Sequence, residues 1–141
     1  MKNPNSFASS YPLEILIADD DTIRRVAMKQ QLAELGYKPE EAASDSEVLS
    51  KAAARRYDVI MMQVLIPGID GILDLARPKA GQKPIFIAIS SSSAYSKEER
   101  VVSLPTQIDS VITRPTDRPE LLLQLKACSV LAGKCFIKSG R

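Results

Sequence analysis

Five short apolar runs alternate with segments of helical periodicity along this chain of 141 residues. A nearly continuous apolar run is typical of a strand buried on both faces of a parallel sheet, and the sequence LEILIA at residues 13–18 is a clear example. We predict strands over residues 13–18, 38–43, 58–63, 85–90 and 108–113. Because parallel neighbours need crossover helices, the alternation predicts one α/β domain, a three-layer sandwich around a five-stranded parallel sheet.

The segments between these runs carry apolar residues at helical spacing. The stretch from Thr22 to Gly36 shows the pattern, and Gly36 is predicted to end this helix. Either Asp21 or Thr22 is a suitable N-cap. Further helices are predicted over residues 44–56, 72–76, 96–104 and 118–132. Pro39 indicates that the second strand lies at the edge of the sheet, because proline has no N–H to donate to a neighbouring strand.

Polar side chains stand where the predicted strands end. In an open parallel sheet, ligands bind outside the carboxyl ends of the strands, where strand order reverses. The residues at those ends are Asp19 and Asp20, Gln63, Ser90 and Arg114. The acidic run from Asp19 to Asp21 also has a simpler interpretation, because carboxylates at a helix N-terminus complement the helix dipole.

Four motifs occur in chain order around these ends: ILIADDD, YDVIMMQVLIPGIDG, IAISS and VITRP. Together they resemble the receiver domains of two-component signalling proteins, the CheY-like response regulator family, over roughly residues 13–131. The resemblance implies a flavodoxin-like (βα)5 fold with strand order 2-1-3-4-5. In that family two acidic residues and a central aspartate hold Mg²⁺, and the aspartate takes a phosphoryl group from a partner's phosphohistidine. A Ser or Thr hydroxyl and a lysine, placed by a cis peptide before proline, then bind the phosphoryl oxygens.

Most functional positions of the family have a match in this sequence. The matching residues are Asp19 and Asp20 for the acidic pair, Ser90 for the hydroxyl, Pro115 for the cis proline, and Pro67, Asp70 and Gly71 for the loop after the acceptor. Two functional positions depart from the family, and a third departure is Val111, which stands at the family's usual aromatic switch. Gln63 stands at the acceptor aspartate, and Arg114 stands at the lysine.

The amide at Gln63 has direct chemical consequences. An acyl phosphate needs a charged oxygen nucleophile, and a carboxamide is neutral and delocalised. Because the same change removes a metal ligand, we expect no cofactor, with Mg²⁺ at Asp19 and Asp20 weak or absent. We expect the guanidinium of Arg114 to bridge Asp19 or Asp20 and partly replace the ion. Contact of Arg114 with Gln63 or with solvent stays open.

These features indicate a degenerate receiver, or pseudo-receiver, that is not an enzyme and regulates by binding, independently of phosphorylation. A sensor histidine kinase or an effector protein is the expected partner, and the leading sequence SSYPLEILIADDD also fits a receiver within a hybrid histidine kinase. A homodimer stays open. Two alternatives also stay open: phosphorylation of another carboxylate, such as Asp20 or Asp21, and a small-ligand sensor with its pocket near Ser90 and Arg114.

The composition argues against several other functions. Lys and Arg total 19 against 17 Asp and Glu, without a basic cluster beside aromatic side chains, so no nucleic-acid partner is expected. The chain has no histidine, which excludes His-based triads and a phosphohistidine of its own. No apolar run approaches the roughly 20 residues of a membrane-spanning helix. The first residues lack a signal-peptide core, so we expect a cytoplasmic protein without membrane contact.

Three segments are expected along the chain. Residues 1–12 are rich in Asn and Ser and are predicted to be a flexible arm or linker. Residues 13–133 form the predicted receiver domain, and residues 134–141 form a C-terminal tail. Cys128 and Cys135 are predicted to be reduced thiols, as is usual in a reducing compartment.

Overall fold

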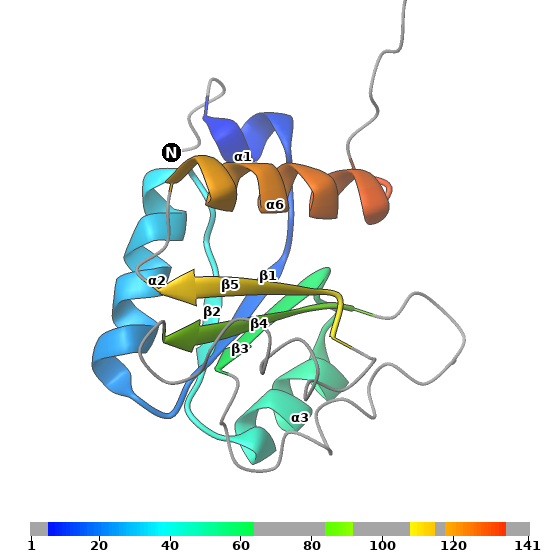
Figure 1. Cartoon of the computed structure of the whole chain (residues 1–141). Coiled ribbons are helices and arrows are strands. Elements are labelled where there is room, and N and C mark those ends of the chain that lie inside the picture. The colour runs from blue at the N-terminus through cyan, green and yellow to red at the C-terminus, as the bar shows by residue number, and fades with distance from the viewer. Residues whose placement is uncertain (1–5, 64–83, 92–107, 115–117, 135–141) are drawn as a thin grey trace, which may run out of the picture.

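A computed structural model describes residues 6–63, 84–91, 108–114 and 118–134, with the side chains of residues 90, 91, 113 and 114 outside that description. Its sheet has five strands, each paired in parallel with its neighbours (Figure 1). They are β1 (Ile15–Ala18), β2 (Glu40–Ala42), β3 (Val59–Gln63), β4 (Ile85–Ser91) and β5 (Ser110–Arg114). The strand order is β2-β1-β3-β4-β5, which confirms the order 2-1-3-4-5 predicted from the family resemblance.

Helices cover both faces of this sheet. The described helices are α1 (Phe7–Ser10), α2 (Thr22–Glu34), α3 (Asp45–Ala54) and α6 (Arg118–Leu131). Figure 1 shows α6 and α3 on opposite sides of the strands, which gives the three predicted layers. The helices predicted over residues 72–76 and 96–104 lie outside the described residues. None of the described helices is long and apolar enough to cross a membrane.

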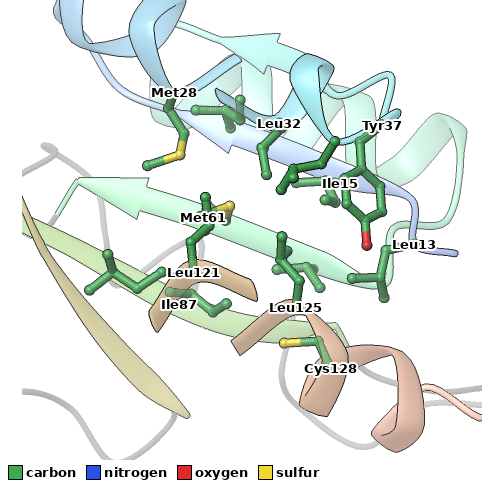
Figure 2. Packing of buried hydrophobic residues seen from close by; sticks show 14 of the residues in the cluster. Leu13, Ile15, Met28, Leu32, Tyr37, Met61, Ile87, Leu121, Leu125 and Cys128 are labelled. Atoms are coloured by element: carbon green, nitrogen blue, oxygen red, sulfur yellow. The ribbon is translucent and has the colours of Figure 1, made fainter. Parts of the chain in front are cut away.

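Alternate strand residues face different layers, as the period of a strand requires. Ile15 and Met61 point to the side of α2 and α6, where Leu125 joins them in the larger apolar cluster (Figure 2). Leu16 and Ile60 point to the other side, where the second cluster includes Val48 of α3 and Phe86 of β4. All four residues of β1 and all five of β3 are buried, so these two strands form the centre of the core.

Side-chain caps set the start of two helices. The carboxylate of Asp21 accepts hydrogen bonds from the backbone N–H groups of Ile23 (2.8 Å) and Arg24 (3.2 Å), which identifies Asp21 and not Thr22 as the N-cap of α2. At α3, the Ser44 hydroxyl accepts from the N–H of Glu47. The Glu47 carboxylate accepts in turn from the N–H of Ala43, a reciprocal arrangement that fixes the first turn.

Part of the predicted N-terminal arm has a defined place. The N–H of Ala8 in α1 donates to the carbonyl of Leu35 (2.9 Å), and the Tyr37 hydroxyl donates to the carbonyl of Tyr11 (2.6 Å). Gly36 lies between these contacts with φ +100°, and a Cβ there would come within 2.6 Å of the Ser6 hydroxyl oxygen. Residues 6–11 therefore lie against the end of α2, which their Asn/Ser-rich composition did not indicate, while the domain boundaries stay a prediction.

Candidate functional site

The predicted site residues share one edge of the sheet. Asp19 follows β1 directly, and its N–H donates to the carbonyl of Ala42 on the neighbouring strand β2 (3.1 Å). Gln63 ends β3, where its side chain is buried with the residue 8% exposed. The backbones of Ser90 and Arg114 lie at the same ends of β4 and β5. The sheet order thus brings the strand ends of all four motifs to neighbouring positions.

Among the described side chains at this edge, Asp19 is the most buried charged group, with an exposed fraction of 0%. One guanidinium binds both of its oxygens: Arg24 Nε donates to Oδ2 (3.1 Å) and Arg24 Nη2 donates to Oδ1 (3.0 Å). Oδ1 also accepts from the backbone N–H of Asp21 (2.9 Å). Burial of a carboxylate is costly unless the charge is paired and hydrogen-bonded, and this two-point contact with Arg24 supplies both.

The same guanidinium also contacts the two following carboxylates. Arg24 Nη2 lies 3.5 Å from Asp20 Oδ1, and Arg24 Nη1 lies 3.3 Å from Asp21 Oδ2. The hydrogen bonds to Asp19 raise the pKa of Arg24 above its ordinary value; partial burial opposes this effect and the nearby aspartate charges add to it. We call the set of Asp19, Asp20, Asp21 and Arg24 the Arg24 clamp. Its cation is permanently charged at any physiological pH.

The start of α2 directs Arg24 to this position. Because Asp21 is the N-cap, Arg24 falls in the first helical turn, and side chains of a helix lean toward its N-terminus. That direction leads back to the end of β1. Arg25, one residue further, leaves the helix at a different angle: its Nε donates to Glu41 Oε1 (3.0 Å) and its Nη1 donates to the carbonyl of Asp19 (2.8 Å).

The described donors do not suit a divalent cation. Mg²⁺ needs carboxylate oxygens within about 2.0–2.1 Å in octahedral geometry. Both oxygens of Asp19 already accept from Arg24, and the side chain at the end of β3 is a neutral amide. Across the described parts of the chain, no group of three or more His, Cys, Asp or Glu side chains is arranged to hold a metal ion.

Several of the predicted site residues lie wholly or in part outside the described residues. The side chains of Ser90 and Arg114 are outside the description, so the predicted bridge from Arg114 to Asp19 or Asp20 stays a prediction. Pro115 is outside it as well, together with the loop residues Pro67, Asp70 and Gly71. The residue that the sequence interpretation missed is Arg24. A signal was present, because the Asp21 cap fixes the helical position of an arginine three residues later.

The amino-acid sequence matches a family model described as the response regulator receiver domain over residues 15–126. Among curated proteins, the response regulator MprA of Mycolicibacterium vanbaalenii is 30% identical over 118 residues, which cover 82% of this chain and 50% of MprA. The probable transcriptional regulatory protein TcrX of Mycobacterium tuberculosis is 24% identical over 133 residues, covering 94% of this chain and 56% of TcrX. The chain thus spans about half the length of these curated relatives.

Solved structures share the fold. A putative response regulator from Chloroflexus aurantiacus superposes with a TM-score of 0.72 at 21% identity, covering 84% of this chain and 98% of that one. The receiver domain of a sensor histidine kinase from Pseudomonas aeruginosa PAO1, described with a magnesium ion in its active-site cleft, gives a TM-score of 0.69 at 21% identity and the same two coverages. At this level of identity the likeness concerns the arrangement of the backbone.

Proposed function

The chain belongs to the response regulator receiver family of two-component signalling, and we propose that it is a receiver that acts by binding, independently of phosphorylation. The observation that carries the proposal is Gln63. It is the last residue of β3, a strand that pairs with β1 on one side and β4 on the other. The buried end of this central strand is where the family's phosphorylation chemistry takes place, and the chain has an amide there.

The amide accounts for the loss of the reaction. Transfer to a receiver forms a bond between a carboxylate oxygen and phosphorus, and the carboxylate's charge makes that oxygen nucleophilic. In a carboxamide the nitrogen lone pair is delocalised and the oxygen is only weakly basic. Deamidation of Gln63 would give glutamate, whose chain is one methylene longer than that of aspartate. The acyl phosphate is therefore not expected at this position.

A receiver that is not phosphorylated can still regulate a partner. A domain with one fixed conformation shifts a partner's equilibrium whenever its affinity differs between the partner's two states. Receiver domains interact with histidine kinases, so a sensor kinase or an effector of the same pathway is the partner that we propose. The chain covers about half of its curated relatives, so a setting within a longer signalling protein is part of this proposal.

Phosphoryl transfer to the purified chain tests the proposal directly. The chain is incubated with acetyl phosphate and Mg²⁺ and its intact mass is measured, with a phosphorylatable receiver as the positive control for the donor. We expect no mass increase. A hydroxylamine-labile increase of one phosphoryl group would contradict the proposal, and its location on Asp20 or Asp21 would support the alternative acceptor.

The Gln63→Asp variant tests whether residue 63 alone prevents phosphorylation or whether neighbouring residues contribute. Phosphorylation of this variant would mean that the change at residue 63 alone explains why the wild type does not accept a phosphoryl group. If the single variant stays unphosphorylated and a second change at Arg24 restores transfer, then the Arg24 clamp contributes to the loss as well. Circular dichroism of each variant shows whether the fold is retained.

A further inference from the structure

The Arg24 clamp does more than neutralise one aspartate. We infer that Arg24 is a built-in cation that occupies the place of a divalent metal at this edge and keeps the three carboxylates closed to Mg²⁺. This inference goes beyond the proposed function, because it concerns cation binding at Asp19, Asp20 and Asp21 and holds whichever residue stands at position 63.

The hydrogen bonds of Asp19 provide the first argument. An ionised carboxylate oxygen has two lone-pair positions. Oδ1 of Asp19 already accepts from Arg24 Nη2 at 3.0 Å and from the N–H of Asp21 at 2.9 Å, and Oδ2 accepts from Arg24 Nε at 3.1 Å. A metal ion that coordinated Oδ1 would have to displace one of these donors. The backbone donor belongs to the start of α2, so the guanidinium is the group that would have to leave.

Charge provides the second argument. A divalent ion bound to Asp19 would share its carboxylate with a guanidinium that lies within 3.5 Å of oxygens on all three aspartates. Like charges at such distances repel strongly inside a protein, where the effective dielectric constant is lower than in water. The positive end of the α2 dipole adds to this repulsion. The ion would therefore gain little from the acidic cluster while Arg24 remains in place.

Tethering provides the third argument. Arg24 is part of the same chain and begins only five residues after Asp19, so its binding to the carboxylate is intramolecular. An intramolecular ligand competes at a high effective concentration, commonly in the millimolar range for short tethers. A metal ion with a similar intrinsic affinity for the carboxylates must therefore reach a similar free concentration before it displaces the guanidinium. An ion with a lower affinity needs a higher concentration.

The same helix offers a matched control. Lys29 carries the same charge on α2 and pairs with Glu41 at 2.9 Å. This partner lies on β2 and is not one of the three aspartates. Lys29→Gln and Arg24→Gln therefore each remove one positive charge from α2, and only the second removes the cation that contacts Asp19.

Mn²⁺ is a suitable probe, because the paramagnetic resonance signal of the free ion reports binding directly. We expect the wild-type chain and Lys29→Gln to leave Mn²⁺ free at concentrations where Arg24→Gln binds it, with Kd at least tenfold lower in Arg24→Gln. A Tm that rises with Mn²⁺ only in Arg24→Gln would support the same conclusion. Equal Kd values for the wild type and Arg24→Gln, or tighter binding by the wild type, would overturn the inference.

A second single variant keeps the test decisive if Arg24→Gln unfolds, and a double variant locates the ion if Arg24→Gln folds. Arg24→Lys retains the charge and loses the two-point fork, so its Kd for Mn²⁺ should be lower than that of the wild type; an unchanged Kd would contradict the inference. Asp19→Asn combined with Arg24→Gln removes the central carboxylate and should abolish the Mn²⁺ binding. None of these measurements involves phosphoryl transfer, so phosphorylation of the wild type would overturn the proposed function alone.

Discussion

Arg24 and Arg25 are adjacent on α2, yet they serve two ionic regions of different construction. Arg24 faces the fully buried Asp19 and is the cation of the clamp. Arg25 faces Glu41, which also receives a hydrogen bond from Lys29 and is only partly buried. Arg24 binds both oxygens of the fully buried Asp19, whereas the partly buried Glu41 is bound by two cations, Arg25 and the half-exposed Lys29. Removal of one partner should therefore reduce the free energy of unfolding more at Asp19 than at Glu41.

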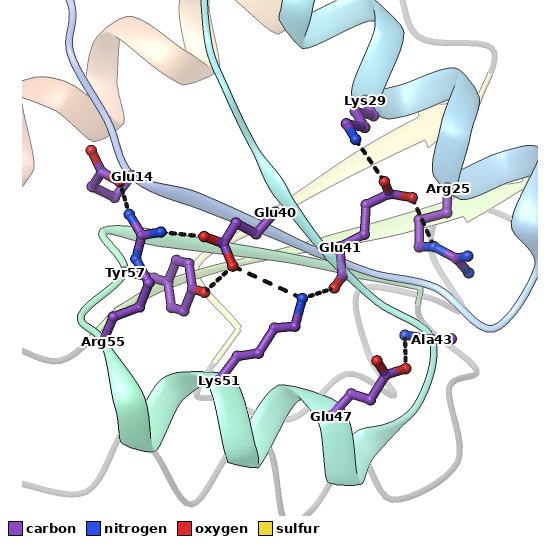
Figure 3. Close-up of polar contacts among 10 residues, drawn as sticks. All are labelled: Glu14, Arg25, Lys29, Glu40, Glu41, Ala43, Glu47, Lys51, Arg55 and Tyr57. Atoms are coloured by element: carbon purple, nitrogen blue, oxygen red, sulfur yellow. Dashed lines mark hydrogen bonds and ion pairs between the residues drawn. The ribbon is translucent and has the colours of Figure 1, made fainter.

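The second region follows the edge strand β2, and we call it the β2 edge network (Figure 3). Its members are Glu14, Arg25, Lys29, Glu40, Glu41, Lys51, Arg55 and Tyr57. Arg55 contacts both Glu14 and Glu40, and the Tyr57 hydroxyl donates to Glu40 at 3.0 Å. Burial raises the pKa of Tyr57 to about 12, and the hydrogen bond to Glu40 adds to this, so the donor keeps its proton. Charged side chains along an edge strand also discourage pairing with another chain.

The largest expected effect is that of Arg24→Gln. Removal of one partner of a buried ion pair commonly costs 3–5 kcal/mol, and the 33% exposure of the Arg24 side chain reduces this to about 2–3 kcal/mol. Urea unfolding followed by circular dichroism measures the change, with metal ions absent. A loss no greater than that of Lys29→Gln would break the comparison between the two regions.

A smaller effect is expected for Glu41→Gln, about 0.5–1 kcal/mol near neutral pH, because Lys29 is half exposed and Arg25 keeps its hydrogen bond to the Asp19 carbonyl. The hydrogen bond from Lys29 lowers the pKa of Glu41 below its ordinary value, burial opposes this, and Arg25 acts in the same direction as Lys29. A carboxylate with a lowered pKa in the folded state stabilises above its unfolded pKa, and the contribution is lost as pH falls through the folded value. The free energies of unfolding of the wild type and Glu41→Gln should therefore converge in acid. Urea midpoints measured near neutral pH and in acid test this. A difference between the two proteins that persists in acid would mean that the ion pairs are not responsible for it.

The smallest effect is expected for Lys29→Gln. The Lys29 side chain is 47% exposed, and pairs of this kind contribute about 0.2–0.5 kcal/mol. Arg25 continues to neutralise Glu41 in this variant. The difference from the wild type should disappear at about 1 M salt, where the Debye length is about 3 Å. A difference that survived high salt would mean that Lys29 contributes by packing its stem.

The sheet could be predicted because its signals are local and repeated. The apolar runs of β1, β3 and β4 end within a residue of their predicted ends, since burial on both faces leaves a nearly continuous pattern. The weaker strands were predicted less well: β2 has three residues, Glu40–Ala42, where six were predicted, and β5 begins at Ser110, two residues later than predicted. Side chains of both strands are partly exposed, so their pattern is less distinct.

The contact of Arg24 with Asp19 could not be predicted from strand-end positions alone. We predicted that a guanidinium fork reaches Asp19 or Asp20 from Arg114, at the end of the fifth strand, and this contact stays a prediction. The structure shows a fork from Arg24, on the helix that follows Asp19. A family pattern points to residues that usually act at the site. The family pattern does not identify Arg24, because the direction of this side chain depends on the N-cap that begins α2.

The short sequence separation within the clamp affects the order of assembly. Asp19 and Arg24 are five residues apart, whereas Lys29 meets Glu41 across 12 residues and Glu14 meets Arg55 across 41. Closing a short loop costs less chain entropy than closing a long one. The contact of Asp19 with Arg24 therefore closes at a lower cost in chain entropy than the contact of Glu14 with Arg55, which needs the start of β1 and the end of α3 to come together.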